Sequence, residues 1–208
     1  PVSRCVTILN HHKGNLMTEH RLITGPTFGE MLDPARIDPA VRAKALKMMQ
    51  TDPLDPLNLF NITWRNGDNR IYYHVLPKQL TVVDANIVVL YGADFPTGSH
   101  KVGAAYSVLV EKELFGEVDP SVHTLVWPST GNYCRGGAYD STLLACDSIA
   151  ILPEEMSRER FEWLSQVAGE VIATPGSESN VKEIFDKCWE LRETREDIAI
   201  FNQFDEFG

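Results

Sequence analysis

The stretch His123-Thr124-Leu125-Val126-Trp127-Pro128-Ser129-Thr130-Gly131-Asn132 decides the fold class of this chain. Its first half is a short apolar run typical of a buried strand, and its second half is a turn of small residues. Residues 133–146 then have the pattern of a helix, with Gly136 and Gly137 inside it. A strand that leads through a short turn into a helix is half of a βαβ unit, so this stretch predicts a parallel sheet.

The same alternation continues on both sides of this stretch. Residues 101–115 before it predict a helix, and the residues after it predict two more strands and two more helices. The strands are expected over 148–152 and 170–173, and the helices over 157–168 and 179–192. Strands that alternate with helices predict an α/β fold with three αβα layers and a mainly parallel sheet. We expect this small α/β domain to span residues 97–208, with 198–204 as a connection that leads onward.

Residues 1–96 have a different character, because they are rich in proline and show little periodicity. Aspartate precedes proline at four places, which are turn signals: Asp33-Pro34, Asp38-Pro39, Asp52-Pro53 and Asp55-Pro56. A short helix is expected over 39–50, and strands over 69–74 and 86–91. The run Ile87–Tyr91 is apolar without alternation, which is typical of a strand covered on both faces. We expect residues 1–96 to contribute strands to a larger, incomplete domain.

Charge and composition exclude several classes of partner. The 208 residues include 19 basic and 29 acidic side chains, for a net charge of −10, and no basic block is present. This balance argues against nucleic acid and against an anionic membrane surface. No apolar run reaches the ~18 residues of a membrane span, so we expect a cytoplasmic protein. The four cysteines and the pair His11-His12 lack metal-ligand spacing, so no metal site is predicted.

Lys101 follows the small-residue turn Pro96-Thr97-Gly98-Ser99-His100 at the start of a predicted helix. The positive end of the helix dipole disfavours the ammonium form of a lysine at this position. A lysine that has to be neutral in order to attack a carbonyl carbon benefits from such a position. The alternative interpretation is a solvated lysine on the first turn of a helix.

The loop Ser129–Asn132 lies where the carboxyl end of a predicted parallel strand turns into a helix. Backbone N–H groups at a helix N-terminus bind anions, and ligands of open α/β sheets gather at this end of the strands. The Ser129 and Thr130 hydroxyls and the Asn132 amide can donate further hydrogen bonds. A plain helix cap is the alternative. Nearby, Arg135 is a candidate to pair with an anionic substrate, or to form a surface salt bridge.

Taken together and in this order, Thr97-Gly98-Ser99-His100-Lys101 and Ser129-Thr130-Gly131-Asn132 resemble two motifs of a known superfamily. It comprises the fold type II pyridoxal-phosphate enzymes, which include tryptophan synthase β and cysteine synthase. The resemblance runs from Asp52-Pro53-Leu54 to Arg192 and implies the N-terminal half of such an enzyme. It implies pyridoxal 5′-phosphate as the cofactor and a small amino acid as the substrate.

The resemblance also implies roles for individual residues. Lys101 would form the Schiff base with the cofactor and act as the catalytic base, and Asn132 would hydrogen-bond the ring oxygen of the cofactor. His100 would lie near the cofactor phosphate. The loop that binds the substrate carboxylate would consist of Ser129, Thr130, Gly131 and Tyr133. The bulky Tyr133 departs from the threonine that is frequent in cysteine synthases, so the substrate is left open.

The glycine-rich loop that holds the cofactor phosphate in this superfamily is expected after Arg192, and the given sequence shows none there. Gly136-Gly137 lies in a helical pattern and is not interpreted as that loop. We therefore expect a truncated or complemented chain, with the missing large domain or a homo-oligomer as partner, and weak cofactor binding by the chain alone. In this superfamily, residues matching Asn86–Tyr91 pair with the large domain, so an exposed apolar strand is expected here.

The implied reaction is β-elimination or β-replacement on a small amino acid, as in cysteine synthases and amino-acid lyases. A second hypothesis is a non-catalytic binding or regulatory module that keeps the small domain of such an enzyme. A third, a nucleotide binder with a flavodoxin-like or Rossmann-like fold, is disfavoured because no G-x-G-x-x-G or Walker loop follows a predicted strand.

Overall fold

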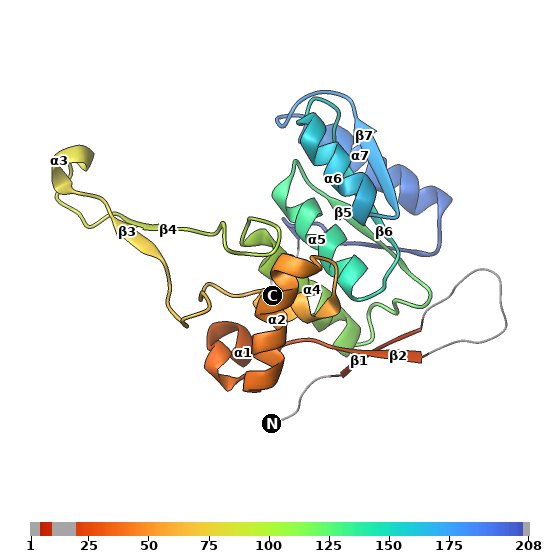
Figure 1. Cartoon of the computed structure of the whole chain (residues 1–208). Coiled ribbons are helices and arrows are strands. Elements are labelled where there is room, and N and C mark those ends of the chain that lie inside the picture. The colour runs from red at the N-terminus through yellow and green to blue at the C-terminus, as the bar shows by residue number, and fades with distance from the viewer. Residues whose placement is uncertain (1–4, 10–19, 206–208) are drawn as a thin grey trace.

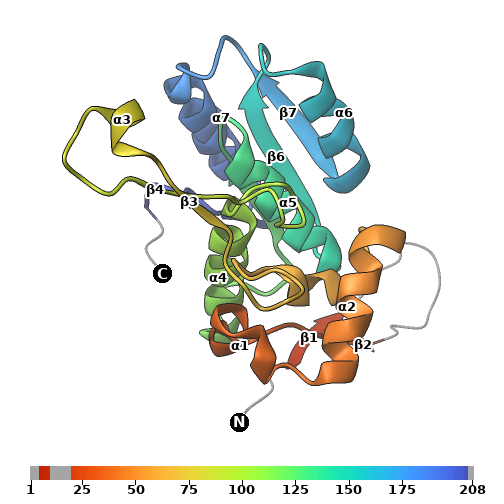
Figure 2. The same cartoon turned by 60° about the vertical axis from the view of Figure 1, so that its left-hand side comes forward.

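The computed structural model describes residues 5–9 and 20–205 of the chain (Figure 1). The predictions that concern His11 and His12 lie outside the described residues. The centre of the fold is a four-stranded parallel sheet with three helices against one face and a fourth helix against the other, as Figures 1 and 2 show from two sides. The α/β class and the three αβα layers predicted from the sequence are therefore confirmed.

The sheet has the strand order β7-β6-β5-β8. Its strands are β5 (Thr124–Pro128), β6 (Ser148–Pro153), β7 (Glu170–Thr174) and β8 (Ile198–Ile200). The first three match the predicted strands within a residue. The connection expected over 198–204 is wrong at its start, because Ile198–Ile200 pairs in parallel with Thr124–Val126 of β5. Three residues are too few for a periodic signal, so only pairing with a neighbour defines this strand.

Helices α4 (Lys101–Leu114), α5 (Asn132–Leu143) and α6 (Arg158–Val167) cover one face of the sheet, and α7 (Val181–Thr194) covers the other. Alternating strand residues face the two layers. One buried cluster joins α4, α5 and α6 to Leu125, Trp127, Ala150 and Leu152. The other joins Ile184, Cys188 and Leu191 of α7 to Val126, Ile149 and Ile151. Because both faces are covered, residues 125–128 of β5 and 149–153 of β6 are apolar without interruption.

The N-terminal part begins with an antiparallel pair, β1 (Cys5–Leu9) and β2 (His20–Thr24). The helices α1 (Phe28–Leu32) and α2 (Pro39–Thr51) and the 3-10 helices η1 (Pro34–Arg36) and η2 (Pro56–Asn61) follow. The helix predicted over 39–50 is confirmed. At Asp33, Asp38 and Asp55 the aspartate accepts a backbone N–H as N-cap while proline takes the first helical position. The turn signals at these three places are therefore helix starts.

A thin arm projects from the body of the fold (Figure 1). It consists of β3 (Tyr73–Val75) and β4 (Val88–Leu90), which pair antiparallel, with α3 (Lys78–Thr81) between them. The strands are shorter than predicted. The interpretation of 87–91 as a strand covered on both faces is wrong for this chain, since Val88, Val89 and Leu90 are 41–52% exposed. The exposed apolar strand expected here is confirmed.

Two consecutive glycines let α5 pack unusually close to the sheet. A Cβ atom at Gly137 would lie 1.9 Å from Cδ2 of Trp127, inside the indole ring. Trp127 is fully buried, stacks on Phe201 at 4.4 Å between ring centroids, and donates a 2.9 Å hydrogen bond from Nε1 to the Ser141 hydroxyl. The large indole of β5 thus occupies the volume that a side chain at position 137 would take.

We expect Gly137→Ala to lower the free energy of unfolding by about 3 kcal/mol, despite the higher helix propensity of alanine, because the indole has no room to move. Urea denaturation followed by circular dichroism measures this. Gly67→Ala is the matched control, since the nearest atom to its Cβ, Cδ1 of Leu46, is 3.8 Å away. Equal stability of the two variants would contradict the packing argument.

Asp140 is a buried carboxylic acid in the same helix. It is fully buried, and neither carboxyl oxygen has a hydrogen-bond partner among the described residues. Burial holds the pKa of this carboxyl well above its usual range, because ionisation without a partner is costly in the protein interior. The folded chain therefore keeps Asp140 protonated where the unfolded chain ionises it.

This difference predicts a pH dependence of stability. Above about pH 4 the folded state binds more protons than the unfolded state, so the free energy of unfolding falls with rising pH, by at most about 1.4 kcal/mol per unit. The fall ends above the pKa of the folded state. In denaturation experiments at pH 4 to 8, the free energy of unfolding of Asp140→Asn should fall less steeply with pH than that of the parent chain. Asp147→Asn, at an exposed position after α5, controls for the lost charge, and parallel slopes for Asp140→Asn and the parent chain would refute the assignment.

Candidate functional site

The loop between β5 and α5 forms the centre of the candidate site. Ser129 is buried, its backbone N–H donates to the carbonyl of Ile151 in β6 at 3.0 Å, and its Oγ accepts from the Gly131 N–H at 3.2 Å. These two bonds hold the loop against the end of the sheet. Asn132 is the first residue of α5 and is exposed.

The N-cap residue of α5 is Gly131, which has no side chain that could cap the first turn. The first N–H groups of a helix have no acceptor within the helix, and the helix dipole places positive potential there. The hydroxyl of Ser129 in the loop accepts a hydrogen bond from the backbone N–H of Gly131, which precedes the helix. This arrangement can bind a carboxylate, because the turn offers backbone donors without a competing acidic cap.

Lys101 is brought to this loop by close packing between two helices. It is the first residue of α4, it is half-buried, and its backbone N–H donates to Ser99 Oγ at 3.3 Å. A Cβ atom at Gly136, one turn after Asn132, would lie 2.9 Å from the Lys101 carbonyl oxygen and 2.8 Å from Val102 Cα. The absence of a side chain at position 136 thus lets the start of α5 lie against the start of α4, where Lys101 is.

Arg160 joins this loop from the next βα unit. It lies in the first turn of α6, and its Nη1 donates to the Thr130 carbonyl at 3.1 Å. A Cβ atom at Gly131 would lie 2.7 Å from Nη1 and 2.8 Å from Cζ of Arg160, so the guanidinium lies directly on the glycine. Sequence analysis missed this residue, because no spacing rule relates position 160 to position 130.

We compared the chain with known proteins. No family model matches it. It is 34% identical over 110 residues to a probable cysteine synthase from Bacillus subtilis, which covers 53% of this chain and 35% of that protein. It is 38% identical over 80 residues to cystathionine beta-synthase from Saccharomyces cerevisiae, which covers 38% of this chain and 16% of that protein.

Solved structures agree in fold. An O-acetylserine dependent cystathionine beta-synthase from Helicobacter pylori superposes with a TM-score of 0.58 at 21% identity, over 66% of this chain and 45% of that one. A hydrogen sulfide-producing enzyme from Fusobacterium nucleatum gives 0.53 at 24% identity, over 63% and 41%. Over these partial spans the chain is similar in sequence to a probable cysteine synthase and to cystathionine beta-synthase, and similar in fold to the two solved structures. It spans about a third of the length of the Bacillus relative (35%).

Two residues suggested by the superfamily resemblance make aromatic contacts. His100 is exposed, and its ring stacks on Trp64 at 5.5 Å between centroids with planes 23° apart. Tyr133 is only 3% exposed, and its ring meets the edge of Trp127 at 5.5 Å. The side chain of Tyr133 therefore packs in the core beneath α5, and the atoms it presents to the loop are those of its backbone.

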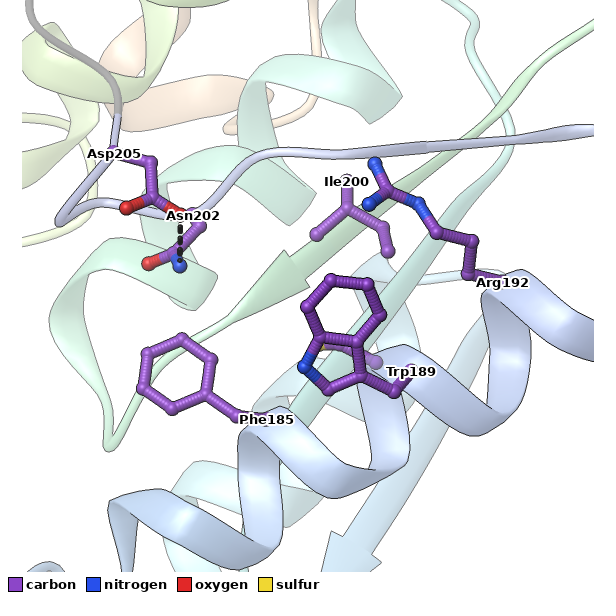
Figure 3. A pocket seen from close by; sticks show the side chains of 7 residues that line it. Phe185, Trp189, Arg192, Ile200, Asn202 and Asp205 are labelled. Atoms are coloured by element: carbon purple, nitrogen blue, oxygen red, sulfur yellow. Dashed lines mark hydrogen bonds between the residues drawn. The ribbon is translucent and has the colours of Figure 1, made fainter.

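A cavity of about 470 Å³ lies elsewhere, beside α7 (Figure 3). Its walls are Phe185, Cys188, Trp189, Arg192, Ile200, Asn202 and Asp205. Figure 3 shows Phe185 and Trp189 on α7 facing the strand that carries Ile200. None of the residues predicted for the superfamily site lines this cavity, and α7 covers the face of the sheet opposite to α4 and α5.

The described residues offer neither a metal-binding cluster nor a membrane-spanning helix. Histidine, cysteine and acidic side chains of residues 5–9 and 20–205 form no group of three or more that could hold a metal ion. Within the part of the chain that the structure describes, no helix has the length and hydrophobicity needed to cross a bilayer.

Proposed function

We propose that this chain carries the lysine-bearing part of a pyridoxal-phosphate enzyme that performs β-elimination or β-replacement on a small amino acid. The observation that supports this most is the packing of α5 on the start of α4 at Gly136, next to Lys101 and one turn from Asn132. The partial match to cysteine synthases, which are pyridoxal-phosphate enzymes, supports the same reaction class.

The described residues fit two parts of such a site: the lysine that would hold the cofactor, and the loop that would bind the substrate carboxylate. Lys101 is half-buried at the start of α4, so its side chain can reach a ligand without first leaving a buried ion pair. Asn132 is exposed at the start of α5, and the N-cap residue Gly131 has no side chain to compete for the donors of this turn. The strand-to-helix loops before α5 and α7 each contain a single glycine, Gly131 and Gly176, so other protein segments would supply a glycine-rich loop for the cofactor phosphate.

Each residue has a distinct role in the proposal. Lys101 would hold the cofactor through its side-chain amine and would serve as the base that takes the proton from the substrate Cα. The loop Ser129–Gly131 and the first turn of α5 bind the substrate carboxylate, and Asn132 orients the ring of the cofactor through its oxygen. His100 lies beside Lys101 and would serve the phosphate. The bound cofactor supplies an electron sink for the charge that develops at Cα.

The proposal includes a partner structure. The arm β3–α3–β4 exposes a run of apolar side chains, and exposed apolar surface of this extent usually contacts other protein. We infer that the active protein has a further large domain or is a homo-oligomer, and we propose that it acts in the cytoplasm.

Covalent trapping tests the proposed role of Lys101. The chain is incubated with pyridoxal phosphate, reduced with borohydride and digested, and modified lysines are located by mass spectrometry. Because the chain covers only part of its relatives, we expect weak attachment, which reduction accumulates. Adduct on Lys101 should exceed that on the more exposed Lys78, should persist in Lys78→Ala and should disappear in Lys101→Ala. Labelling of all lysines in proportion to their exposure would refute the proposal.

A further inference from the structure

Two arginines converge on the candidate carboxylate loop, and the proposed function leaves them unused. Arg160 lies on Gly131, as described above. Arg135 is in the first turn of α5, its backbone N–H donates to the Gly131 carbonyl at 3.0 Å, and its guanidinium lies 4.5 Å from the ring centroid of Trp163 in α6. Both side chains therefore reach the same corner from two neighbouring helices.

Neither arginine has an acidic partner. Among the residues described, no carboxylate lies within ion-pair distance of Arg135 or Arg160, and the Nε atom of each is buried without a hydrogen-bond partner. Within the described part of the chain, Arg160 donates hydrogen bonds from Nη1 alone, to the Thr130 carbonyl and to the Met156 sulfur. Both side chains are half-buried, where an unpaired charge is costly.

The two charges also act on each other. Burial is the largest cause that lowers the pKa of Arg135, and the positive charge of Arg160 is the next. Cys134 and Glu159 act in the opposite direction and raise it. Two like charges held together without a counter-ion form a site that an anion would stabilise, with the guanidinium forks matched to an oxyanion.

We propose that Arg135 and Arg160 bind a second oxyanion on the side chain of the substrate amino acid, beside the loop that receives its α-carboxylate. The assignment of this anion to a substrate rests on the proposed function. The substrate class is then an amino acid with an acidic side-chain group such as a phosphate ester. A neutral amino acid would leave both guanidinium groups without a partner.

Isothermal titration of the full chain at low ionic strength tests this, with O-phospho-L-serine, L-serine and inorganic phosphate as the probes. We expect O-phospho-L-serine to bind at least about tenfold more tightly than L-serine, because charged hydrogen bonds add that much affinity. Arg135→Gln should remove this preference. Arg158→Gln is the matched control, since Arg158 lies on the same α6, is 91% exposed and pairs with Glu162.

Each outcome decides the proposal. A preference that survives in Arg135→Gln, or inorganic phosphate that binds as tightly as O-phospho-L-serine, would overturn it. If Arg135→Gln fails to fold, Arg135→Lys replaces it, because this variant keeps the charge and should keep part of the preference. Equal binding of O-phospho-L-serine and L-serine to Arg135→Lys would count against the site. Loss of Lys101 trapping with a retained, Arg135-dependent preference would refute the proposed function and leave the anion site standing.

Discussion

The rest of the structure depends on the close approach of α5 to two neighbours at once. Gly137 leaves room for the indole of Trp127, and Gly136 leaves room for the backbone of α4 at Lys101 and Val102. A methyl group at either position would push α5 away from the sheet or from α4. Since α5 begins with the loop that follows β5, this contact also sets how far the loop lies from Lys101.

The same packing explains where polar groups can be tolerated. Asp140 lies one turn further along α5, fully buried without a partner, and is neutral in the folded chain because burial raises its pKa. Arg135 and Arg160 cannot lose their charges in this way, because a guanidinium stays protonated. Half-buried cations at the N-terminus of a helix, with no carboxylate within ion-pair distance among the described residues, are therefore a stronger sign of a ligand than a buried acid is.

The alternation of short apolar runs with helical patterns was enough to predict the α/β class, three of the four strands of the parallel sheet and all the helices of its two outer layers. These elements are local, and each is long enough to show its own period. Strand β8 was missed because three residues show no period. The Asp-Pro pairs were interpreted as turns because proline marks the first residue of a helix as well as a turn. The exposure of β4 was anticipated only through the resemblance to a superfamily.

The sequence by itself determined the types of chemistry that are present: a lysine after a small-residue turn, and a Ser-Thr-Gly-Asn loop after a strand. The tertiary structure decided which residues meet. The contact of Gly136 with Lys101 and the convergence of Arg160 on Gly131 join residues 35 and 29 positions apart. The core position of Tyr133 joins α5 to the sheet. Such contacts arise from the packing of helices on a common sheet, and no local pattern of residues encodes them.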